Sequence, residues 1–437
     1  MAIVRVSGPA AVAVARRVFR GHPPHRWRSH RLYLGRFVNA EEQDLDRGLA
    51  VMMRAPHSYT GEDVVELHCH GGTLVARRIL GAVLDAGART ARAGEFTARA
   101  LLNGKLDLAQ AESVADLINA PPDAALRVAV DQLGGALSRK IAAIRQRLIG
   151  IGARLEVAID FSEEDVGELD RRALTEQAAA TEGELLALVA SYAHGRVLRE
   201  GLRVAIVGKP NVGKSSLMNH LLQADRAIVT PIPGTTRDTL EEWIELEGMP
   251  VVLVDTAGVR QADGEVERIG IERTRREIAN ADLAVVMLDS SHPLASEDRE
   301  VLDATRHKER ILLINKIDLP TQLSMSELAE DLLKASVKSS LVDGRGLDSL
   351  TQKIVASGLH GSTPNGEVVV VRERQRSALE SAASAAAKVV KSLELGQPAD
   401  IVAVDVMSAL GHLGDVVGPT SVEDLLDRVF SEFCIGK

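Results

Sequence analysis

The sequence predicts a multidomain protein that combines α/β and all-α parts. Its 437 residues provide enough chain for roughly two to four domains. Between residues 201 and 360, short apolar runs alternate with helical or loop segments, which is typical of a parallel sheet with helices on both faces. Stretches rich in alanine and leucine on either side, at 105–200 and 361–437, predict helices. Residues 1–104 mix strand-like runs with a helical segment. Along the chain these residues are the first part, 105–200 the second and 201–360 the third.

In the first part, the apolar runs predict four strands and one helix. The strands are expected at 2–6, 32–38, 49–53 and 64–67, and the helix at 73–86. In the second part, apolar residues recur in steps of three and four, which places them on one face of a helix as core or as a helix–helix contact. These residues are Leu137, Ile141, Ile144, Leu148, Ile151 and Leu155.

In the third part, four apolar runs predict buried strands at 204–207, 251–254, 283–288 and 311–314. A polar stretch with glycine and proline at 358–366 predicts a linker, after which helices resume. The α/β unit is therefore expected to be inserted between two helical stretches that pack together as one domain.

Composition and charge exclude several classes of protein. With 45% hydrophobic and 26% charged residues and a mean hydropathy of +0.01, the chain resembles an ordinary soluble protein. No apolar stretch reaches the roughly 18 residues of a membrane span, and Arg5 interrupts the only apolar run near the N-terminus, so no secretory signal is predicted. Two distant cysteines fit a reducing cytoplasm. A net charge of -9 argues against a protein that coats nucleic acid, so RNA contacts would need a local patch or a partner.

The first chemical motif is a phosphate loop, Gly208-Lys-Pro-Asn-Val-Gly213-Lys214-Ser215, between a predicted strand and a helix. Its glycines allow backbone N–H groups to surround phosphates, and the helix N-terminus adds a favourable potential. We expect Lys214 to contact the β- and γ-phosphates and Ser215 to ligate Mg²⁺.

Two further motifs fit the γ-phosphate side of such a site. Residues 233–238, Pro-Gly-Thr-Thr-Arg-Asp, carry a threonine that can close over Mg²⁺, although a Pro-Gly-Thr turn alone is common. Residues 255–258, Asp-Thr-Ala-Gly, end a predicted strand. There the aspartate can hold the water shell of the metal, and the glycine N–H can sense the γ-phosphate.

The fourth motif, Asn315-Lys316-Ile317-Asp318, predicts guanine specificity. The Asp318 carboxylate can accept hydrogen bonds from the N1–H and 2-amino groups of guanine. Adenine lacks the 2-amino group, which costs about 1.5–3 kcal/mol per lost charged hydrogen bond. Ser336-Val337-Lys338 is a candidate guanine-backing loop, with valine where alanine is usual. The motifs together predict a GTPase.

The residue after the third motif is Val259, where many GTPases place a glutamine that orients the attacking water. Water activation must therefore come from another group. One candidate is Glu267 on the following helix, and the other is a cation held by Asn211 in the phosphate loop. The alternative for Glu267 is a solvated charge on the surface of that helix.

With its flanking regions, the sequence resembles the MnmE/TrmE family, the tRNA modification GTPases that act on the wobble uridine. The resemblance rests on the Pro-Asn-Val-Gly-Lys-Ser and Pro-Gly-Thr-Thr-Arg-Asp forms of the motifs and runs from residue 2 to residue 437. Matching segments outside these motifs are 58–66, 70–72, 94–97, 102–112, 265–272 and 433–437.

The resemblance implies three domains. An N-terminal α+β, aminomethyltransferase-like domain that binds tetrahydrofolate and dimerises would occupy 1–104. A helical domain would consist of 105–200 and 361–437, and a Ras-like P-loop GTPase domain of 201–360. The family begins with a strand and a glycine-rich loop ahead of residues 2–5, so the sequence is expected to start inside that element.

The resemblance also implies an activity and partners. A cytoplasmic homodimer and an FAD-dependent partner form a heterotetramer that acts on tRNA. They add an aminomethyl or carboxymethylaminomethyl group to C5 of the wobble uridine, using a one-carbon unit from folate. Hydrolysis is activated when the two G domains of the dimer meet with GTP and K⁺ bound.

Site residues follow from the resemblance position by position. Lys214, Asn211 and Glu267 would serve catalysis, with Glu267 orienting the attacking water. K⁺ would lie among Asn211, Thr230, Ile232 and Thr235, and Mg²⁺ between Ser215 and Thr236. The expected GTP contacts are Asn211, Val212, Gly213, Lys214, Ser215, Ser216, Thr230, Pro231, Ile232, Pro233, Gly234, Thr235, Thr236, Asp255, Thr256, Ala257, Gly258, Asn315, Lys316, Asp318, Ser336, Val337 and Lys338.

The expected folate contacts are Arg5, Glu66, Lys105 and Lys437. Cationic side chains suit the carboxylates of the folate glutamate, and a carboxylate suits the pterin N–H donors. Cys434 is either a nucleophile that faces the folate or a buried structural cysteine, and Cys69 is expected in the core. The basic run at 26–31 is either a contact to tRNA phosphates or a solvated loop.

Two alternative functions remain. A ribosome-assembly GTPase shares the G motifs but normally carries an RNA-binding module such as a KH domain, and no Gly-x-x-Gly clamp occurs in a matching context. A folate-binding protein with a regulatory G domain is the other, although Lys214, Ser215 and Asp318 are all intact.

Overall fold

The structure is a computed structural model that describes residues 1–21, 27–119, 123–160, 170–224, 241–255, 275–334, 336–358 and 368–418. The chain divides into two compact units. The first comprises 1–115, 132–145 and 410–437, and the second comprises 116–131 and 146–409. Among the helices of the described ranges, none has the length and apolar character needed to cross a membrane.

The first unit contains a five-stranded sheet in the order β1-β5-β4-β3-β2, in which every neighbouring pair is antiparallel. Each strand that the apolar runs predicted is present, and β2 is a short additional edge strand. Their bounds are β1 Ala2–Ser7, β2 Phe19–Gly21, β3 Leu32–Val38, β4 Asp44–Met53 and β5 Val64–Cys69.

Side chains alternate across this sheet because successive residues of a strand point to opposite faces. Val4 and Val6 of β1 belong to the core that includes residues of α1 (Ala11–Val18) and α2 (Thr73–Asp85). Arg5 and Glu66 occupy the alternate positions of β1 and β5. The helices therefore cover one face, and polar side chains remain on the other.

The other elements described in the first unit are helices, and several of them continue into the second. They are α3 Glu95–Leu102, α4 Leu108–Asn119, α5 Asp123–Leu133, α6 Ala136–Asp160 and α15 Ala399–Val417. The six residues of the predicted stripe on α6, Leu137, Ile141, Ile144, Leu148, Ile151 and Leu155, are all fully buried. The stripe is therefore core, as expected.

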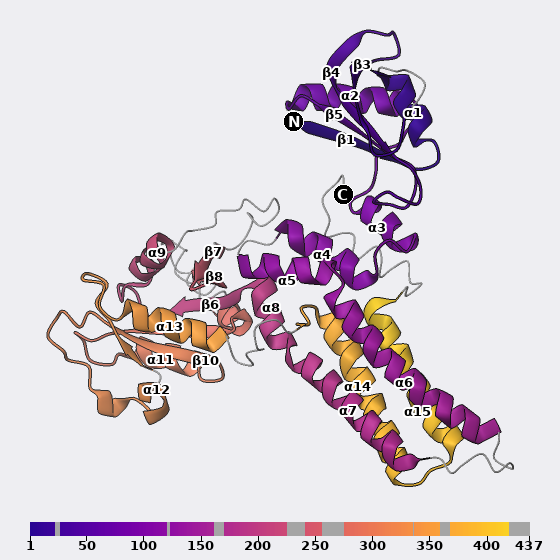
Figure 1. The fold of residues 1–437 in the computed structure, drawn as a ribbon. Coiled ribbons are helices and arrows are strands. Elements are labelled where there is room, and N and C mark those ends of the chain that lie inside the picture. The colour runs from indigo at the N-terminus through magenta and orange to yellow at the C-terminus, as the bar shows by residue number, and fades with distance from the viewer. Residues whose placement is uncertain are drawn as a thin grey trace. The chain divides into compact units, whose positions relative to one another are not determined.

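In the second unit, helices from both sides of the α/β region pack together. Figure 1 shows α14 (Glu373–Glu394) beside α7 (Arg171–Ala190), although nearly 200 residues of sequence separate them. Asp116 accepts hydrogen bonds from Arg199 Nε of α8 (Tyr192–Glu200), at 2.9 Å, and from Arg372 Nη2, at 2.8 Å. One carboxylate thus joins the chain that enters the α/β region to the chain that leaves it.

The α/β region is built on a six-stranded sheet in the order β11-β10-β9-β6-β8-β7. All neighbouring strands are parallel except β7, which pairs antiparallel with β8 at the edge. The strand bounds are β6 Leu202–Val207, β7 Glu241–Leu246, β8 Met249–Asp255, β9 Leu283–Asp289, β10 Glu309–Asn315 and β11 Val337–Lys338.

Both faces of this sheet are covered, as expected for a doubly wound fold. Val204 and Ile206 of β6 point into one core with residues of α9 (Lys214–Ala224) and α13 (Leu347–Gly358). Ala205 and Val207 point into a second core on the other face. That face is lined by α11 Ser296–Ala304, the 3-10 turn η1 Met325–Glu327 and α12 Glu330–Lys334.

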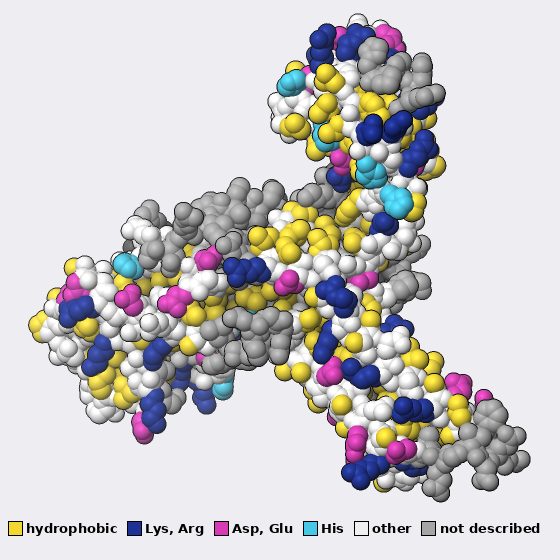
Figure 2. Space-filling view, in the orientation of Figure 1, with side chains coloured by type: hydrophobic (Ala, Val, Ile, Leu, Met, Phe, Trp, Pro, Cys, Tyr) yellow, Lys and Arg dark blue, Asp and Glu magenta, His cyan; other side chains and the backbone are white. Residues whose placement is uncertain are grey.

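These observations confirm the predicted fold class. The predicted linker at 358–366 lies almost wholly outside the described residues, and so does Arg26, the first residue of the basic run. Trp27 of that run is buried against Phe19 and Tyr33. On the face seen in Figure 2, Lys and Arg side chains are interspersed with Asp and Glu and form no single basic patch.

Candidate functional site

The phosphate loop lies where the sheet changes direction. The chain passes from β6 to β8 on one side and returns to β9 on the other side of β6, and ligands of such sheets bind at the carboxyl ends of the strands beside this point. Gly208 follows β6, and α9 begins at Lys214. Ser215 and Ser216 are exposed on its first turn, where the helix potential favours anions.

The Lys214 ammonium is held over the loop that precedes it. Its Nζ donates to the carbonyl oxygens of Gly208, at 2.7 Å, and Lys209, at 2.9 Å. The side chain therefore folds back across the loop, and the cation lies where phosphate oxygens are expected.

Gly213 permits close approach between the phosphate loop and the fourth motif. A Cβ atom at this position would lie 2.6 Å from Asn315 Nδ2, and the backbone has a φ of +113°. Because the side chain is absent, Asn315 Nδ2 can donate to the carbonyl of Val212 at 2.9 Å. A hydrogen bond thus connects the phosphate-binding and base-binding segments.

Lys316 makes a second connection. Its Nζ donates to the Asn211 carbonyl at 2.9 Å and forms an ion pair with Asp289 Oδ2 at 2.7 Å. Asn211 and Lys316 both have left-handed backbone conformations, with φ of 63° each. Asp289, the last residue of β9, thereby fixes a cation that in turn fixes the strained turn of the phosphate loop.

The electrostatics of Asp289 suit this role. Its side chain is 4% exposed, and burial disfavours the charged carboxylate. Hydrogen bonds from Lys316 and from the hydroxyl and N–H of Ser291 outweigh burial and lower the pKa of Asp289 to about 2. The carboxylate is therefore charged throughout the physiological pH range.

Asp318 is exposed beyond the end of β10, where a base can reach it. The expected guanine-backing loop needs a correction. Ser336 precedes β11 and donates to the carbonyl of Leu333, so it lies at the amino end of this parallel strand. The segment that reaches the site follows β11 instead, because Ser339 Oγ lies 3.4 Å from Asn315 Oδ1 and its carbonyl accepts from Ile317 N–H.

Comparisons with known proteins agree with this geometry. The chain matches the profile described as the MnmE helical domain over residues 108–434 and that of the GTP-binding protein TrmE N-terminus over residues 1–105. It is 46% identical to the tRNA modification GTPase MnmE of Moorella thermoacetica, covering 100% of this chain and 96% of that protein. The protein of the same name from Pediococcus pentosaceus is 42% identical, with 100% and 95% covered.

The chain belongs to the MnmE family of tRNA modification GTPases. This confirms the resemblance that the motifs indicated, and with it the expectation of a GTP-hydrolysing enzyme.

Part of the expected MnmE site lies outside the described residues. This part includes Thr230, Pro231, Ile232, Pro233, Gly234, Thr235, Thr236, Thr256, Ala257, Gly258, Glu267, Cys434 and Lys437. Asp255 ends β8 at the same edge of the sheet as Gly208, since Ile206 and Asp255 are register partners. The first residue of the third motif is thus beside the phosphate loop.

In the N-terminal unit of this MnmE-family chain, two expected folate residues meet. Arg5 and Glu66 are register partners on β1 and β5, and Arg5 Nε donates to Glu66 Oε1 at 2.8 Å. The Arg5 guanidinium also lies over the rings of Tyr59 and Phe96, at 5.9 and 5.6 Å. Lys105 donates to the carbonyl of Pro56 at 3.1 Å. Cys69 is buried in the core, as expected, and burial raises the pKa of its thiol.

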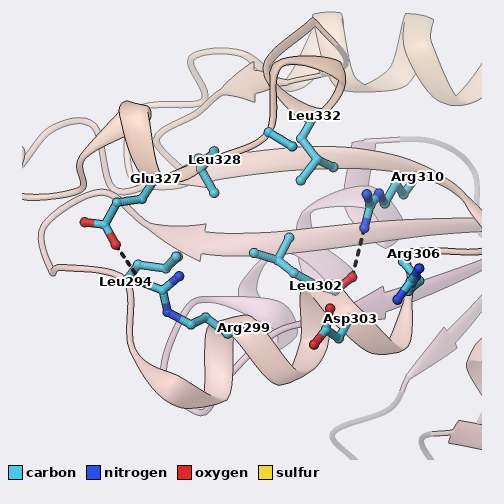
Figure 3. Close-up of a pocket in the computed structure, with 10 residues that line it drawn as sticks. Leu294, Arg299, Leu302, Asp303, Arg306, Arg310, Glu327, Leu328 and Leu332 are labelled. Carbon is cyan, nitrogen blue, oxygen red and sulfur yellow. Dashed lines mark hydrogen bonds and ion pairs between the residues drawn. The ribbon is translucent and has the colours of Figure 1, made fainter.

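A separate pocket of about 340 Å³ lies on the α11 and α12 side of the α/β region (Figure 3). Leu294, Leu302, Leu328 and Leu332 give it apolar walls, and Arg299 pairs with Glu327 across it at 2.6 Å. None of its lining residues belongs to the nucleotide motifs, so this pocket is not the nucleotide site.

The sequence motifs did not include Asp289 and Ser339. Asp289 carried a signal, because it ends the buried strand β9 as Asp255 ends β8, and polar residues at the carboxyl ends of parallel strands point to a site. Ser339 carried no comparable signal, since the motif-like Ser336-Val337-Lys338 lies three residues earlier.

Proposed function

We propose that this MnmE-family chain binds and hydrolyses GTP at the carboxyl edge of its six-stranded sheet, and that hydrolysis serves the modification of C5 of the wobble uridine in tRNA. One observation carries the proposal. The Lys214 ammonium over the phosphate loop and the Asn315 side chain of the base-reading motif are tied to the same loop by hydrogen bonds of 2.7–2.9 Å. A phosphate-binding lysine and an asparagine of the base-binding motif, both fixed to one loop, suit the binding of a guanine nucleotide.

The described residues suggest how phosphates are bound. Lys214 exchanges two backbone carbonyls for phosphate oxygens, which gives stronger, charge-assisted hydrogen bonds. Backbone N–H groups of the loop and of the first turn of α9 surround the same oxygens. Ser215, with Thr236, would hold Mg²⁺, which when bound supplies positive charge beside the transferring phosphoryl group.

Base recognition is proposed to rest on Asp318, with Lys316 and the segment after β11. Asp289 holds Lys316 in place, so that the lysine stem is available to lie along the base while its ammonium remains paired. Ser339, Ser340 and Leu341 are the residues we propose for the guanine-backing loop, in place of Ser336, Val337 and Lys338.

We propose that water activation depends on Glu267 and on K⁺ held by Asn211, Thr230, Ile232 and Thr235, with two G domains meeting in a homodimer. The support from described residues is Asn211. Its backbone is fixed in a left-handed turn by Lys316, and its side chain is exposed at the rim of the phosphate loop. K⁺ there would add positive charge next to the phosphates.

The one-carbon unit is proposed to come from a folate bound by Arg5, Glu66, Lys105 and Lys437, with an FAD-dependent partner completing the modification. Arg5 and Glu66 present a cation and a carboxylate side by side on the face of the sheet opposite the apolar core. This pairing suits a ligand that carries both carboxylates and N–H donors. Cys434 remains a candidate nucleophile.

Asp318→Asn tests the base-reading role. Replacing the carboxylate by an amide should move preference from GTP to xanthosine triphosphate, by about tenfold or more per exchanged hydrogen bond. Multiple-turnover phosphate release with both nucleotides measures this. Unchanged selectivity would contradict the assignment, and a single turnover without further release would favour a regulatory G domain over an enzyme.

Two further measurements test the finer proposals. Replacement of KCl by NaCl should depress GTP turnover sharply if K⁺ joins the G domains, and equal rates would remove that proposal. Mass spectrometry of tRNA nucleosides from cells without this chain should show unmodified wobble uridine, which the restored chain reverses.

A further inference from the structure

The second residue of the phosphate loop, Lys209, is anchored by a buried carboxylate on another element. Its Nζ lies 2.7 Å from Oδ2 of Asp298 on α11, and the two side chains are 16% and 3% exposed. A lysine at the mouth of a phosphate site would ordinarily be solvated or face the phosphates. This ammonium instead points into the α/β region.

Lys209 also carries one of the two carbonyls that hold the Lys214 ammonium, at 2.9 Å. Its backbone is restricted because Pro210 follows it. The adjacent Gly208 packs so closely on β9 that a Cβ there would lie 2.7 Å from the Met287 carbonyl oxygen. The side chain of Lys209 therefore anchors the loop at the residue that follows the tight contact of Gly208. Gly208 and Lys209 also supply the two carbonyls that hold Lys214.

Asp298 is itself held rigidly. It lies in the first turn of α11, and its Oδ2 accepts from the N–H of Ala295 at 3.0 Å. Its Oδ1 is buried and has no hydrogen-bond partner among the described residues. A buried carboxylate with one oxygen unsatisfied is a poor way to gain stability, because desolvation offsets much of the attraction within the pair.

We propose that Asp298 is a positioning residue for the nucleotide. Through its ion pair with Lys209 it holds the start of the phosphate loop, and so the carbonyls that hold Lys214, in the geometry that binds the phosphates. The inference rests on the proposed GTP function and adds to it a residue that lies outside every nucleotide motif.

The test is release of a fluorescent GDP analogue from the full chain, measured by stopped flow. Asp298→Asn and Lys209→Met should each speed release about tenfold, as expected when a binding loop loses its fixed geometry. Because the two residues act through one contact, the double variant should be no faster than either single variant. Lys209→Arg, which can keep the pair, should restore most of the slow release.

A matched control separates positioning from general destabilisation. Arg299 follows Asp298 in α11 and forms an ion pair with Glu327 (Figure 3). Arg299→Gln breaks that pair and leaves the Lys209–Asp298 pair intact. It should leave nucleotide release unchanged even where it lowers the thermal midpoint of unfolding. A release rate that follows the midpoint across all variants would indicate a merely structural role and overturn the proposal.

The remaining outcomes are decisive. Wild-type release rates in Asp298→Asn and Lys209→Met, or a roughly hundredfold effect in the double variant, would overturn the inference alone. If Asp298→Asn does not fold, the Lys209→Met and Lys209→Arg pair still decides. A wild-type chain that binds no GDP analogue would overturn the proposed function, and this inference with it.

Discussion

The two sheets of this chain present their polar residues in different ways. The six-stranded sheet is covered on both faces, and in the sequence its expected nucleotide residues lie at or directly after the carboxyl ends of β6, β8 and β10. The five-stranded sheet has one covered face, and Arg5 and Glu66 lie on the other, in mid-strand. In the first case the expected nucleotide residues lie in loops, and in the second the expected folate residues Arg5 and Glu66 lie in the strands themselves.

This difference explains why the expected nucleotide residues are evident from local motifs in the sequence and the expected folate residues are not. A phosphate loop requires glycines, a lysine and a helix start within eight residues, so its chemistry is local. Arg5 and Glu66 are 61 positions apart and meet only through the register of β1 and β5. Only the family resemblance singled them out.

The largest effect is expected for Lys214→Ala, at the start of α9 beside the six-stranded sheet. Removing the ammonium from the phosphates should lower kcat about 100- to 1000-fold, as for other donors placed at developing negative charge. Phosphate release under multiple turnover measures this, with circular dichroism as the control for folding. Turnover within tenfold of wild type would show that the loop does not use this lysine.

A pair of glycines compares the two units directly. Gly213→Ala forces a methyl group to within 2.6 Å of Asn315 Nδ2 at a φ of +113°, and should destabilise the second unit by about 1–3 kcal/mol and weaken nucleotide binding. Gly81→Ala, inside α2 with nothing within 4 Å, should stabilise the first unit by about 0.5–1 kcal/mol. Unfolding in urea, followed separately for each unit, measures both, and equal signs would contradict the packing described.

Asp289→Asn tests the charged centre of the nucleotide site. The folded-state pKa of Asp289 is lowered to about 2, so its contribution is present above the unfolded value near 4 and lost as pH falls through 2. The wild type should exceed the variant by about 2 kcal/mol at pH 7. That gap should narrow between about pH 4 and pH 2. A difference that stays constant over this range would exclude the ionisation as its cause.

Glu95, in the first unit, provides the control for the pH dependence of stability. Its pKa is also lowered to about 2, chiefly by the hydrogen bond from Arg89, against partial burial. Glu95→Gln should therefore show the same pH window without any change in nucleotide binding.

A small loss of stability is expected for Arg5→Ala. The Arg5 side chain is 30% exposed, so solvent screens its pair with Glu66 and the loss should be about 0.5–1 kcal/mol. The free energy of tetrahydrofolate binding, measured by calorimetry, should fall by more than the free energy of unfolding does. Arg36→Ala, which removes an exposed pair with Asp44 on the same sheet, is the control and should leave folate binding unchanged.

Much of the fold was predictable because the strongest apolar runs coincide with buried strands. The runs at 251–254 and 311–314 are the centres of β8 and β10. The edge strand β7 was not predicted, because Glu241–Leu246 mixes charged and apolar residues. In the structure, Glu247 and Gly248 form the turn between β7 and β8, and both have positive φ, as in a tight hairpin.

The guanine-backing loop shows where local similarity misleads. Ser336-Val337-Lys338 resembles such a loop, but β11 occupies two of these residues and reaches the site only at Ser339. A shift of three residues along a parallel strand moves a side chain about 10 Å, from one edge of the sheet toward the other.

The sequence by itself determined the nucleotide motifs, their order, and the α/β and helical parts. The reason is that loop chemistry and apolar periodicity each depend on a few neighbouring residues. Only the tertiary structure decided that Asp289 holds Lys316, that Asp298 holds Lys209, and that Arg5 faces Glu66. Each of these pairs joins residues 27–89 positions apart. The meeting of such residues depends on strand register and helix packing, which no short stretch of sequence specifies.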